Sequence, residues 1–166
     1  WSPESLPIKE NHRLNAINPY GQNKIDIESI ISGESFFQEN CCATILRYFN
    51  PVGAFHNGII GEIPKGVPSN LMPYLLGVAN NIYPILNVFG GDYDTHDGSA
   101  VRDYIHIMDL VHAHYLALEN NKTGVQIYNI GTGNGFSVLE IIKAFENVSQ
   151  INIPFKIRPR RDGDVA

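Results

Sequence analysis

The stretch that decides the fold is Asn18-Pro19-Tyr20-Gly21-Gln22-Asn23-Lys24, and it runs directly into an isoleucine-rich segment at residues 25–31. Asparagine is a favoured helix N-cap, and proline is favoured at the first helical position because its missing N–H needs no partner there. The stretch therefore predicts a helix that begins at Pro19 and holds Tyr20 in its first turn. Two places remain open for the end of this helix, residues 32–33 and residues 38–40.

Tyr20 and Lys24 are four residues apart, a spacing that puts both side chains on one face of a helix. A tyrosine works as a base at neutral pH only if its pKa falls by roughly three units from about 10, which corresponds to about 4 kcal/mol. A cation about 4 Å away supplies about that energy at an effective dielectric near 20, but only about 1 kcal/mol in water. The pair is therefore a candidate acid–base site if a closed pocket surrounds it, although the spacing alone also arises by chance.

Composition excludes several classes of protein. The chain has 166 residues, 43% of them hydrophobic, enough for one substantial core or two small ones. A net charge of -5 without a basic run argues against nucleic acid or an anionic membrane as the main partner. Apolar runs stay well short of the roughly 20 residues that span a bilayer. Cys41 and Cys42 form neither a zinc motif nor a disulfide framework, which suits a reducing compartment.

The remaining chain alternates between strand-like and helical patterns, which predicts an α/β fold. A continuously apolar strand after a helix is typical of a parallel sheet that is covered on both faces. We expect strands at residues 42–49 (ended by Asn50-Pro51), 85–89, 101–107, 125–130 and 155–158. We expect helices at residues 71–79 (capped by Ser69 or Asn70), 108–119 (with Asp109 at its start) and 137–148, and loops at residues 51–69, 90–100 and 131–136.

Three features resemble ligand sites but favour a structural role. The glycines of residues 131–135 lie where a dinucleotide-binding turn would lie, but their spacing is wrong and no acidic residue follows about 20 positions later. The acidic loop at residues 92–97 lacks the glutamate that ends a calcium loop. His112 and His114 are two residues apart and so point to different helix faces. We therefore expect a tight turn and no metal site.

A few charged residues are better placed to bind a nucleotide. Arg102 follows a glycine-containing loop, and Arg160-Arg161 precede Asp162-Gly163-Asp164. The planar fork of arginine suits a diphosphate, and a carboxylate suits the diol of a ribose. Surface salt bridges are the alternative explanation for these residues.

Longer motifs throughout the chain occur in this order in one known family. They are the 18–24 stretch with its Tyr20 and Lys24, Leu46-Arg47-Tyr48-Phe49-Asn50-Pro51-Val52-Gly53-Ala54, Asn70-Leu71-Met72-Pro73-Tyr74, Asn87-Val88-Phe89-Gly90, Asp92-Tyr93-Asp94-Thr95, Asp97-Gly98, Val101-Arg102-Asp103-Tyr104-Ile105-His106, Tyr128-Asn129-Ile130-Gly131-Thr132-Gly133 and Arg160-Arg161-x-Gly163-Asp164. With these motifs the chain resembles the UDP-glucose 4-epimerases, members of the extended short-chain dehydrogenase/reductase family, along nearly its whole length.

The resemblance implies a fold, an activity and a cofactor. Residues 1–50 would be the remainder of an NAD-binding, doubly wound Rossmann domain, and residues 51–166 would be mainly a small α/β UDP-sugar-binding domain, incomplete at its C-terminus. The intact protein would interconvert UDP-glucose and UDP-galactose with tightly bound NAD. It would act in galactose metabolism, in the cytoplasm, as a homodimer.

The resemblance also implies a role for individual residues. Tyr20 would be the base that takes the proton of the sugar 4-hydroxyl, and Lys24 would favour the phenolate and bond the nicotinamide ribose. Tyr48 would lie beside the nicotinamide. The arginines would meet the diphosphate, Phe89 the uracil and Asp164 the ribose. The residues that fall on the family's UDP-sugar positions are Asn50, Asn70, Leu71, Asn87, Val88, Phe89, Arg102, Arg161 and Asp164.

The chain departs from the family pattern at four positions. Ser69 and Gly91 stand where the family usually has asparagine, Asn23 where it has serine, and Ala100 where it has glycine.

The family's glycine-rich NAD turn and catalytic Ser or Thr lie before Trp1. We therefore expect the chain to be a fragment that alone neither binds NAD tightly nor turns over. The alternatives are another nucleotide-sugar enzyme of the same superfamily, such as a 4,6-dehydratase or a decarboxylase, and a non-catalytic sugar-nucleotide-binding remnant.

Overall fold

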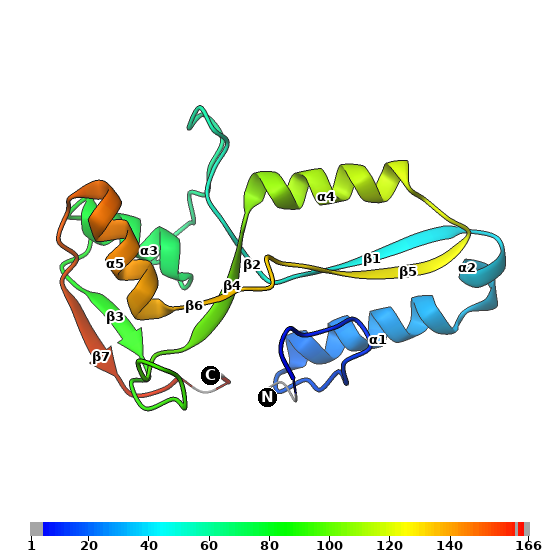
Figure 1. Ribbon diagram of the computed structural model, residues 1–166, viewed down its shortest axis with the longest axis horizontal. Coiled ribbons are helices and arrows are strands. Elements are labelled where there is room, and N and C mark those ends of the chain that lie inside the picture. Colours follow the sequence, from blue (N-terminus) through cyan, green and yellow to red (C-terminus); the bar gives the residue numbers. More distant parts are fainter. Residues whose placement is uncertain (1–4, 162, 165–166) are drawn as a thin grey trace.

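The helix predicted at Pro19 forms as expected. The computed structural model describes residues 5–161 and 163–164, and its first helix, α1, spans Pro19–Gly33 (Figure 1). Asn18 is the N-cap, and its side chain accepts a hydrogen bond of 2.8 Å from the backbone N–H of Gly21. The earlier of the two predicted ends is the right one, because the short helix α2 (Ser35–Glu39) follows as a separate element.

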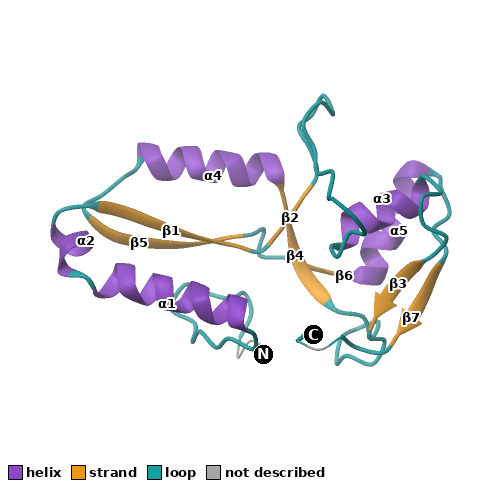
Figure 2. Cartoon of the chain, turned by 180° about the vertical axis from the view of Figure 1, so that it is seen from behind, coloured by secondary structure: helices purple, strands orange, loops and turns teal. Residues whose placement is uncertain are grey.

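A two-stranded parallel sheet follows α2. β1 (Cys42–Tyr48) pairs with β5 (Gly124–Ile130), in a register that runs from Cys42 opposite Gly124 to Tyr48 opposite Ile130. Figures 1 and 2 show α1 on one side of this sheet and α4 (Ile107–Glu119) on the other. Arg47 ties the sheet to α1, since its Nε donates to Glu28 at 3.0 Å. This is the predicted parallel arrangement with helices on both faces.

The other strands and helices form a second region with its own core. β4 (Val101–His106) pairs in parallel with β2 (Asn50–Val52) and antiparallel with β6 (Gly135–Ser137), while β3 (Leu86–Phe89) pairs in parallel with β7 (Phe155–Arg158). Helices α3 (Leu71–Ala79) and α5 (Val138–Ser149) pack beside β3. The buried core consists of Leu75, Val78, Leu86, Val88, Ile142 and Ile153.

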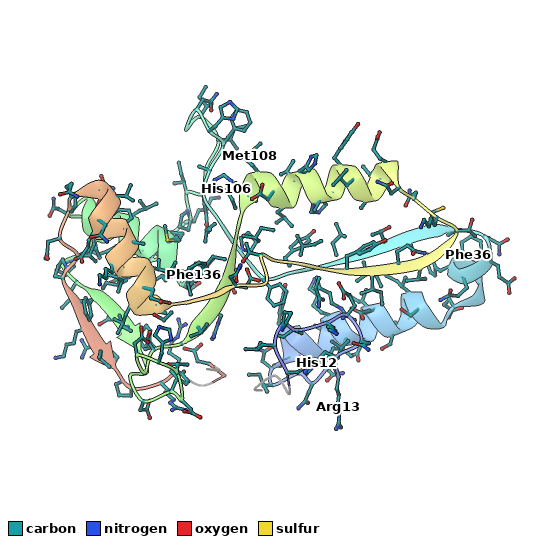
Figure 3. The ribbon with its side chains drawn as sticks, in the orientation of Figure 1. His12, Arg13, Phe36, His106, Met108 and Phe136 are labelled. Carbon is teal, nitrogen blue, oxygen red and sulfur yellow. The ribbon has the colours of Figure 1, made fainter. Side chains whose placement is uncertain are left out.

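Three details of the predicted elements were wrong. The chain does not leave the sheets at Asn50-Pro51, because β2 continues through Val52 along β4. Part of the loop expected at residues 131–136 is the start of β6. α4 begins at Ile107, one residue before the predicted start, with His106 as its N-cap: the His106 ring accepts a hydrogen bond from the N–H of Met108 (Figure 3). Asp109 lies in the first turn, as expected.

The two regions interleave along the sequence. We call the region of α1, α2, β1, α4 and β5 the Tyr-Lys half, and the region of β2, α3, β3, β4, β6, α5 and β7 the pocket half. Between residues 42 and 137 the chain passes from one half to the other three times, at Phe49, at His106–Ile107 and at residues 131–134. Segments beyond residue 50 thus lie beside β1, and the division of the chain at residue 50 stays a prediction.

None of the helices within residues 5–161 combines the length and the apolar character that crossing a membrane requires.

Candidate active site

A cavity of about 560 Å³ opens in the pocket half. Its walls come from β2, the loop before α3, the start of α3, β3, β4 and the C-terminal segment. All nine residues predicted to bind a UDP-sugar line it: Asn50, Asn70, Leu71, Asn87, Val88, Phe89, Arg102, Arg161 and Asp164. The volume falls within the roughly 300–1,000 Å³ of small-ligand pockets, so the nine residues, drawn from six segments, surround a space large enough for a nucleotide.

Arg161 and Asp164 already bond to each other at the mouth of this cavity. The Arg161 Nε donates to Asp164 at 2.9 Å, and the Arg161 guanidinium lies over the ring of Phe89, 4.6 Å from its centroid. Ion pairs exposed to solvent contribute only about 0–1 kcal/mol, so a ligand that offers a phosphate to the arginine displaces this one at little cost. The cation and the carboxylate expected to bind different parts of one nucleotide are therefore neighbours.

β4 supplies a second cation and a phenol. Arg102 lines the cavity and donates to the carbonyl of Val101 at 2.6 Å. Tyr104, two residues later on the same strand, also lines the cavity. Burial raises the pKa of the Tyr104 phenol above its ordinary value, and the positive charge of Arg102 opposes that effect only in part.

Sequence reasoning missed Tyr104 as a cavity residue. Alternate residues of a strand share one face, so the spacing of two from Arg102 is the signal that could have found it.

The polar lining also includes the side chains of Asn70 and Asn87. Asn70 is the N-cap of α3, but its side chain makes no capping hydrogen bond. Asn87 lies in β3 and accepts a hydrogen bond of 2.9 Å from the Nε of Arg158. Beside Asn87, Val88 is only 1% exposed, so the cavity has an apolar wall next to these amides.

Tyr20 and Lys24 pair with each other but lie outside the lining of this cavity. The Lys24 Nζ lies 5.2 Å from the centroid of the Tyr20 ring, within the range of a cation–π contact. Tyr20 is 72% exposed. The end of α1 that carries both residues is the end that faces the pocket half (Figure 1). The predicted pair exists, but the structure does not bring it together with the nine cavity residues.

Tyr48, predicted to lie beside the nicotinamide, ends β1 and bonds to α4. Its hydroxyl lies 2.7 Å from the Nε2 of His114, whose Nδ1 lies 2.8 Å from the carbonyl oxygen of Leu110. A carbonyl only accepts, so the Nδ1 of His114 carries a hydrogen and donates it to Leu110, and Nε2 is the ring atom that bonds the Tyr48 hydroxyl. The sequence itself predicted no bonding role for His114.

The glycine turn and the acidic loop, to which the sequence assigned a structural role, form hydrogen bonds within the chain. The N–H groups of Thr132 and Gly133 donate to Asp103, so this glycine turn already holds a carboxylate. In the acidic loop, Asp97 accepts from Ser99 and Ser137, and Asp92 accepts from Arg160. The structural role predicted for the turn at residues 131–135 is confirmed for Thr132 and Gly133, while Gly135 begins β6.

Comparison with known proteins identifies the family. A model described as "NAD dependent epimerase/dehydratase family" matches residues 2–131. The chain belongs to this family. Curated members from Pasteurella multocida and Bacillus subtilis, each named UDP-glucose 4-epimerase, are each 50% identical to the chain, of which they cover 99%. The chain spans about half the length of these relatives, 49% in both cases.

Solved structures of family members share the architecture. The UDP-glucose 4-epimerase from Bifidobacterium longum, in complex with NAD+ and UDP, has a TM-score of 0.94 at 46% identity. The match covers 99% of this chain and 50% of that enzyme. The enzyme from Stenotrophomonas maltophila, with bound NAD and formylated UDP-arabinopyranose, has a TM-score of 0.93 at 46% identity; the match covers 98% of this chain and 49% of that one. The predicted Rossmann-type α/β fold is therefore confirmed.

The residues of this chain fit one end of an NAD molecule. A phenol and an ammonium side by side at the start of α1 are suitable donors to a ribose hydroxyl and a carboxamide. The turn at residues 131–133 does not fit the NAD diphosphate, because its amides already donate to Asp103. Tyr20 and Lys24 are thus residues whose chemistry fits the cofactor, and the place of Tyr48 beside the nicotinamide stays a prediction.

Proposed function

We propose that this chain provides the UDP-sugar site and the acid–base pair of a UDP-glucose 4-epimerase that interconverts UDP-glucose and UDP-galactose. The observation that carries the proposal is the gathering of all nine expected UDP-sugar residues around one cavity of about 560 Å³. We further propose that the enzyme is a cytoplasmic homodimer that acts in galactose metabolism.

Charge and shape assign each part of a UDP-sugar to a part of the cavity. Arg161 and Arg102 are the cations for the diphosphate, and the guanidinium fork of arginine pairs well with phosphate oxygens. Asp164 accepts hydrogen bonds from the ribose hydroxyls. Phe89 and the neighbouring backbone of β3 bind the uracil, and Asn50 and Asn70 face the sugar.

Tyr20 does the proton chemistry in this proposal. Its phenol oxygen takes the proton of the sugar 4-hydroxyl, and the ammonium of Lys24 favours the phenolate that accepts it. NAD, when bound, supplies the hydride chemistry by accepting a hydride from the sugar carbon and returning it. Since Tyr20 is largely exposed, the energy that Lys24 supplies becomes large only when a bound coenzyme and sugar exclude water.

The 166-residue chain by itself is expected to bind a ligand in the cavity without catalysing the reaction. The cavity proposed for UDP lies within the described residues, whereas the residues proposed to contact NAD, namely Tyr20, Lys24 and Tyr48, lie outside its lining. We therefore expect the isolated chain to bind UDP, to hold NAD weakly and not to turn over UDP-glucose.

Isothermal titration calorimetry of the chain with UDP tests the proposed site. A hydrogen bond to a charged group contributes about 1.5–3 kcal/mol, so Arg161→Gln should weaken UDP binding by about 10–100-fold. Arg160→Gln is the matched control, since Arg160 pairs with Asp92 and stacks on Tyr93 without lining the cavity. Equal losses in both variants, or no UDP binding by the native chain, would contradict the proposal.

A further inference from the structure

Asp103 holds the turn between β5 and β6 with both of its carboxylate oxygens. The N–H of Thr132 lies 2.9 Å from each oxygen, the Thr132 hydroxyl donates to Oδ1 at 2.7 Å, and the N–H of Gly133 donates to Oδ2 at 2.8 Å. Asp103 itself lies in β4, the central strand of the three-stranded sheet. One side chain of the pocket half is thus bonded three times to the segment that enters it from the Tyr-Lys half.

A second crossing segment lies beside the same turn. The N–H of Phe49, between β1 and β2, donates to the carbonyl of Ile130 at 3.0 Å. A Cβ added to Gly131 would lie 2.6 Å from Oδ2 of Asp103 and 2.6 Å from the ring of Phe49. We call Phe49, Asp103, Gly131 and Thr132 the junction cluster, because here the two crossing segments and β4 are in contact.

β4 connects this cluster directly to the cavity and to the third crossing. Arg102, next to Asp103, lines the cavity and lies opposite Phe136 of β6 in the sheet register. β4 ends at His106, where α4 begins and returns along β1 (Figure 3). The hydrogen bonds of Asp103 therefore hold β4 beside the crossing segment at residues 131–134, and the end of β4 leads directly into α4 of the Tyr-Lys half.

We propose that Asp103 is a positioning residue that sets the angle between the Tyr-Lys half and the pocket half, and so sets where the Tyr20 phenol lies relative to a sugar in the cavity. This inference rests on the proposed function, because it assigns the phenol to a substrate held in the other half. Misplacement of a reacting group by about 1 Å costs on the order of 100-fold in rate. A carboxylate with three donors from one turn resists such a displacement.

Asp103→Asn tests the proposal, because it keeps the shape of the side chain and replaces one of the two accepting oxygens with an NH2 group, which cannot accept a hydrogen bond. Spin labels at Ser29 of α1 and Asn147 of α5, both exposed, report the distance between the halves after Cys41 and Cys42 are replaced by serine. We expect a narrow distance distribution for the native chain and one broadened by about twofold or more for Asp103→Asn. Calorimetry should show UDP affinity unchanged within about twofold, because the change leaves the cavity lining intact.

Thr132→Val provides a milder variant that removes the hydroxyl donor and keeps both N–H donors. It should broaden the distribution by less than Asp103→Asn, and it decides the question if Asp103→Asn does not fold. An unchanged distribution in the folded variants overturns the proposal, because a residue that only stabilises the turn would lower the unfolding temperature and leave the distance between the halves as it was. Absence of UDP binding by the native chain would instead refute the proposed function and leave the distance result standing.

Discussion

At the residue scale, several carboxylates of the chain anchor loops. Asp97 accepts from the N–H and the hydroxyl of Ser99 at 2.9 and 2.8 Å, and from the hydroxyl of Ser137. Ser99 and Ser137 are almost completely buried, so these bonds attach the acidic loop to the start of α5. The loop leads to Ala100 and Arg102 of the cavity, and Asp97 therefore helps to shape one wall of the site.

Stability should fall in acid because of Asp97. Burial alone would raise its pKa, but the hydrogen bonds from Ser137 and Ser99 outweigh burial, and the folded-state pKa lies below the ordinary value. A carboxyl with a lowered pKa stabilises the fold above the unfolded-state pKa, about 3.9, and loses that contribution as the pH falls through the folded-state value. We expect the free energy of unfolding, measured with urea, to decrease on going from about pH 5 to pH 3.

Asp97→Asn should flatten this part of the pH dependence, and Asp94→Asn should leave it unchanged. Asp94 is an exposed carboxylate in the same loop and is the matched control. His96 lies beside Asp97, with its Nε2 3.8 Å from the Asp97 carboxylate and 3.3 Å from Glu140. Because all three proteins keep this histidine, the comparison is of their slopes over the same range, about pH 5 to pH 3. An identical slope for native chain and Asp97→Asn would contradict the assignment.

Some site residues could be predicted from local sequence rules, and others only from the family resemblance or from the structure. Tyr20 and Lys24 follow from local helix rules, because four-residue spacing fixes their neighbourhood. The nine cavity residues came from the family resemblance, since nothing in their spacing shows that β3 and the C-terminal segment meet. Asp103 lies 29 positions from Thr132, and its bonds exist only because β4 passes the turn after β5. Contacts of that kind are fixed by tertiary structure.

At the element scale, the start of α1 and the longer strands were predicted, with β3, β5 and β7 within one residue of their expected bounds. The short strands β2 and β6 were not predicted. Asn18 and Pro19 determine the start of α1 without help from the rest of the chain. β2 forms because β4 offers hydrogen-bonding groups alongside it, which outweighs the strand-ending tendency of Pro51. β6, of three residues, likewise depends on β4.

The helices should differ in how strongly their amides resist hydrogen exchange. Of the residues of α1, all of them described, none is buried, whereas α5 buries Ile142 in the core and begins with a capping box of Ser137 and Glu140. Local opening is easiest where few apolar contacts must break. We expect hydrogen–deuterium exchange mass spectrometry to show exchange in α1 at least about tenfold faster than in α5.

This comparison has an internal control in α3, which buries Leu75 and Val78 and should exchange as slowly as α5. Equal protection of α1 and α5 would mean that the two halves unfold as one unit, contrary to the distribution of buried residues.

At the scale of the whole molecule, the proposed site needs both halves. The cavity belongs to the pocket half, and Tyr20 and Lys24 belong to the Tyr-Lys half. The family relatives that share this architecture are about twice as long as the chain. Under the proposed function, catalysis requires a defined orientation between the halves, and the role proposed for Asp103 is to maintain it.

The most direct test of the central claim is an epimerase assay of a hybrid protein, in which this chain replaces the segment that it matches in the Bacillus subtilis relative. The hybrid should convert UDP-glucose to UDP-galactose. Tyr20→Phe should lower kcat by about 100-fold or more, since general base catalysis contributes about that much. Tyr115→Phe, on α4, should have no effect. Full activity after loss of the Tyr20 hydroxyl would contradict the claim that this phenol carries the proton of the sugar.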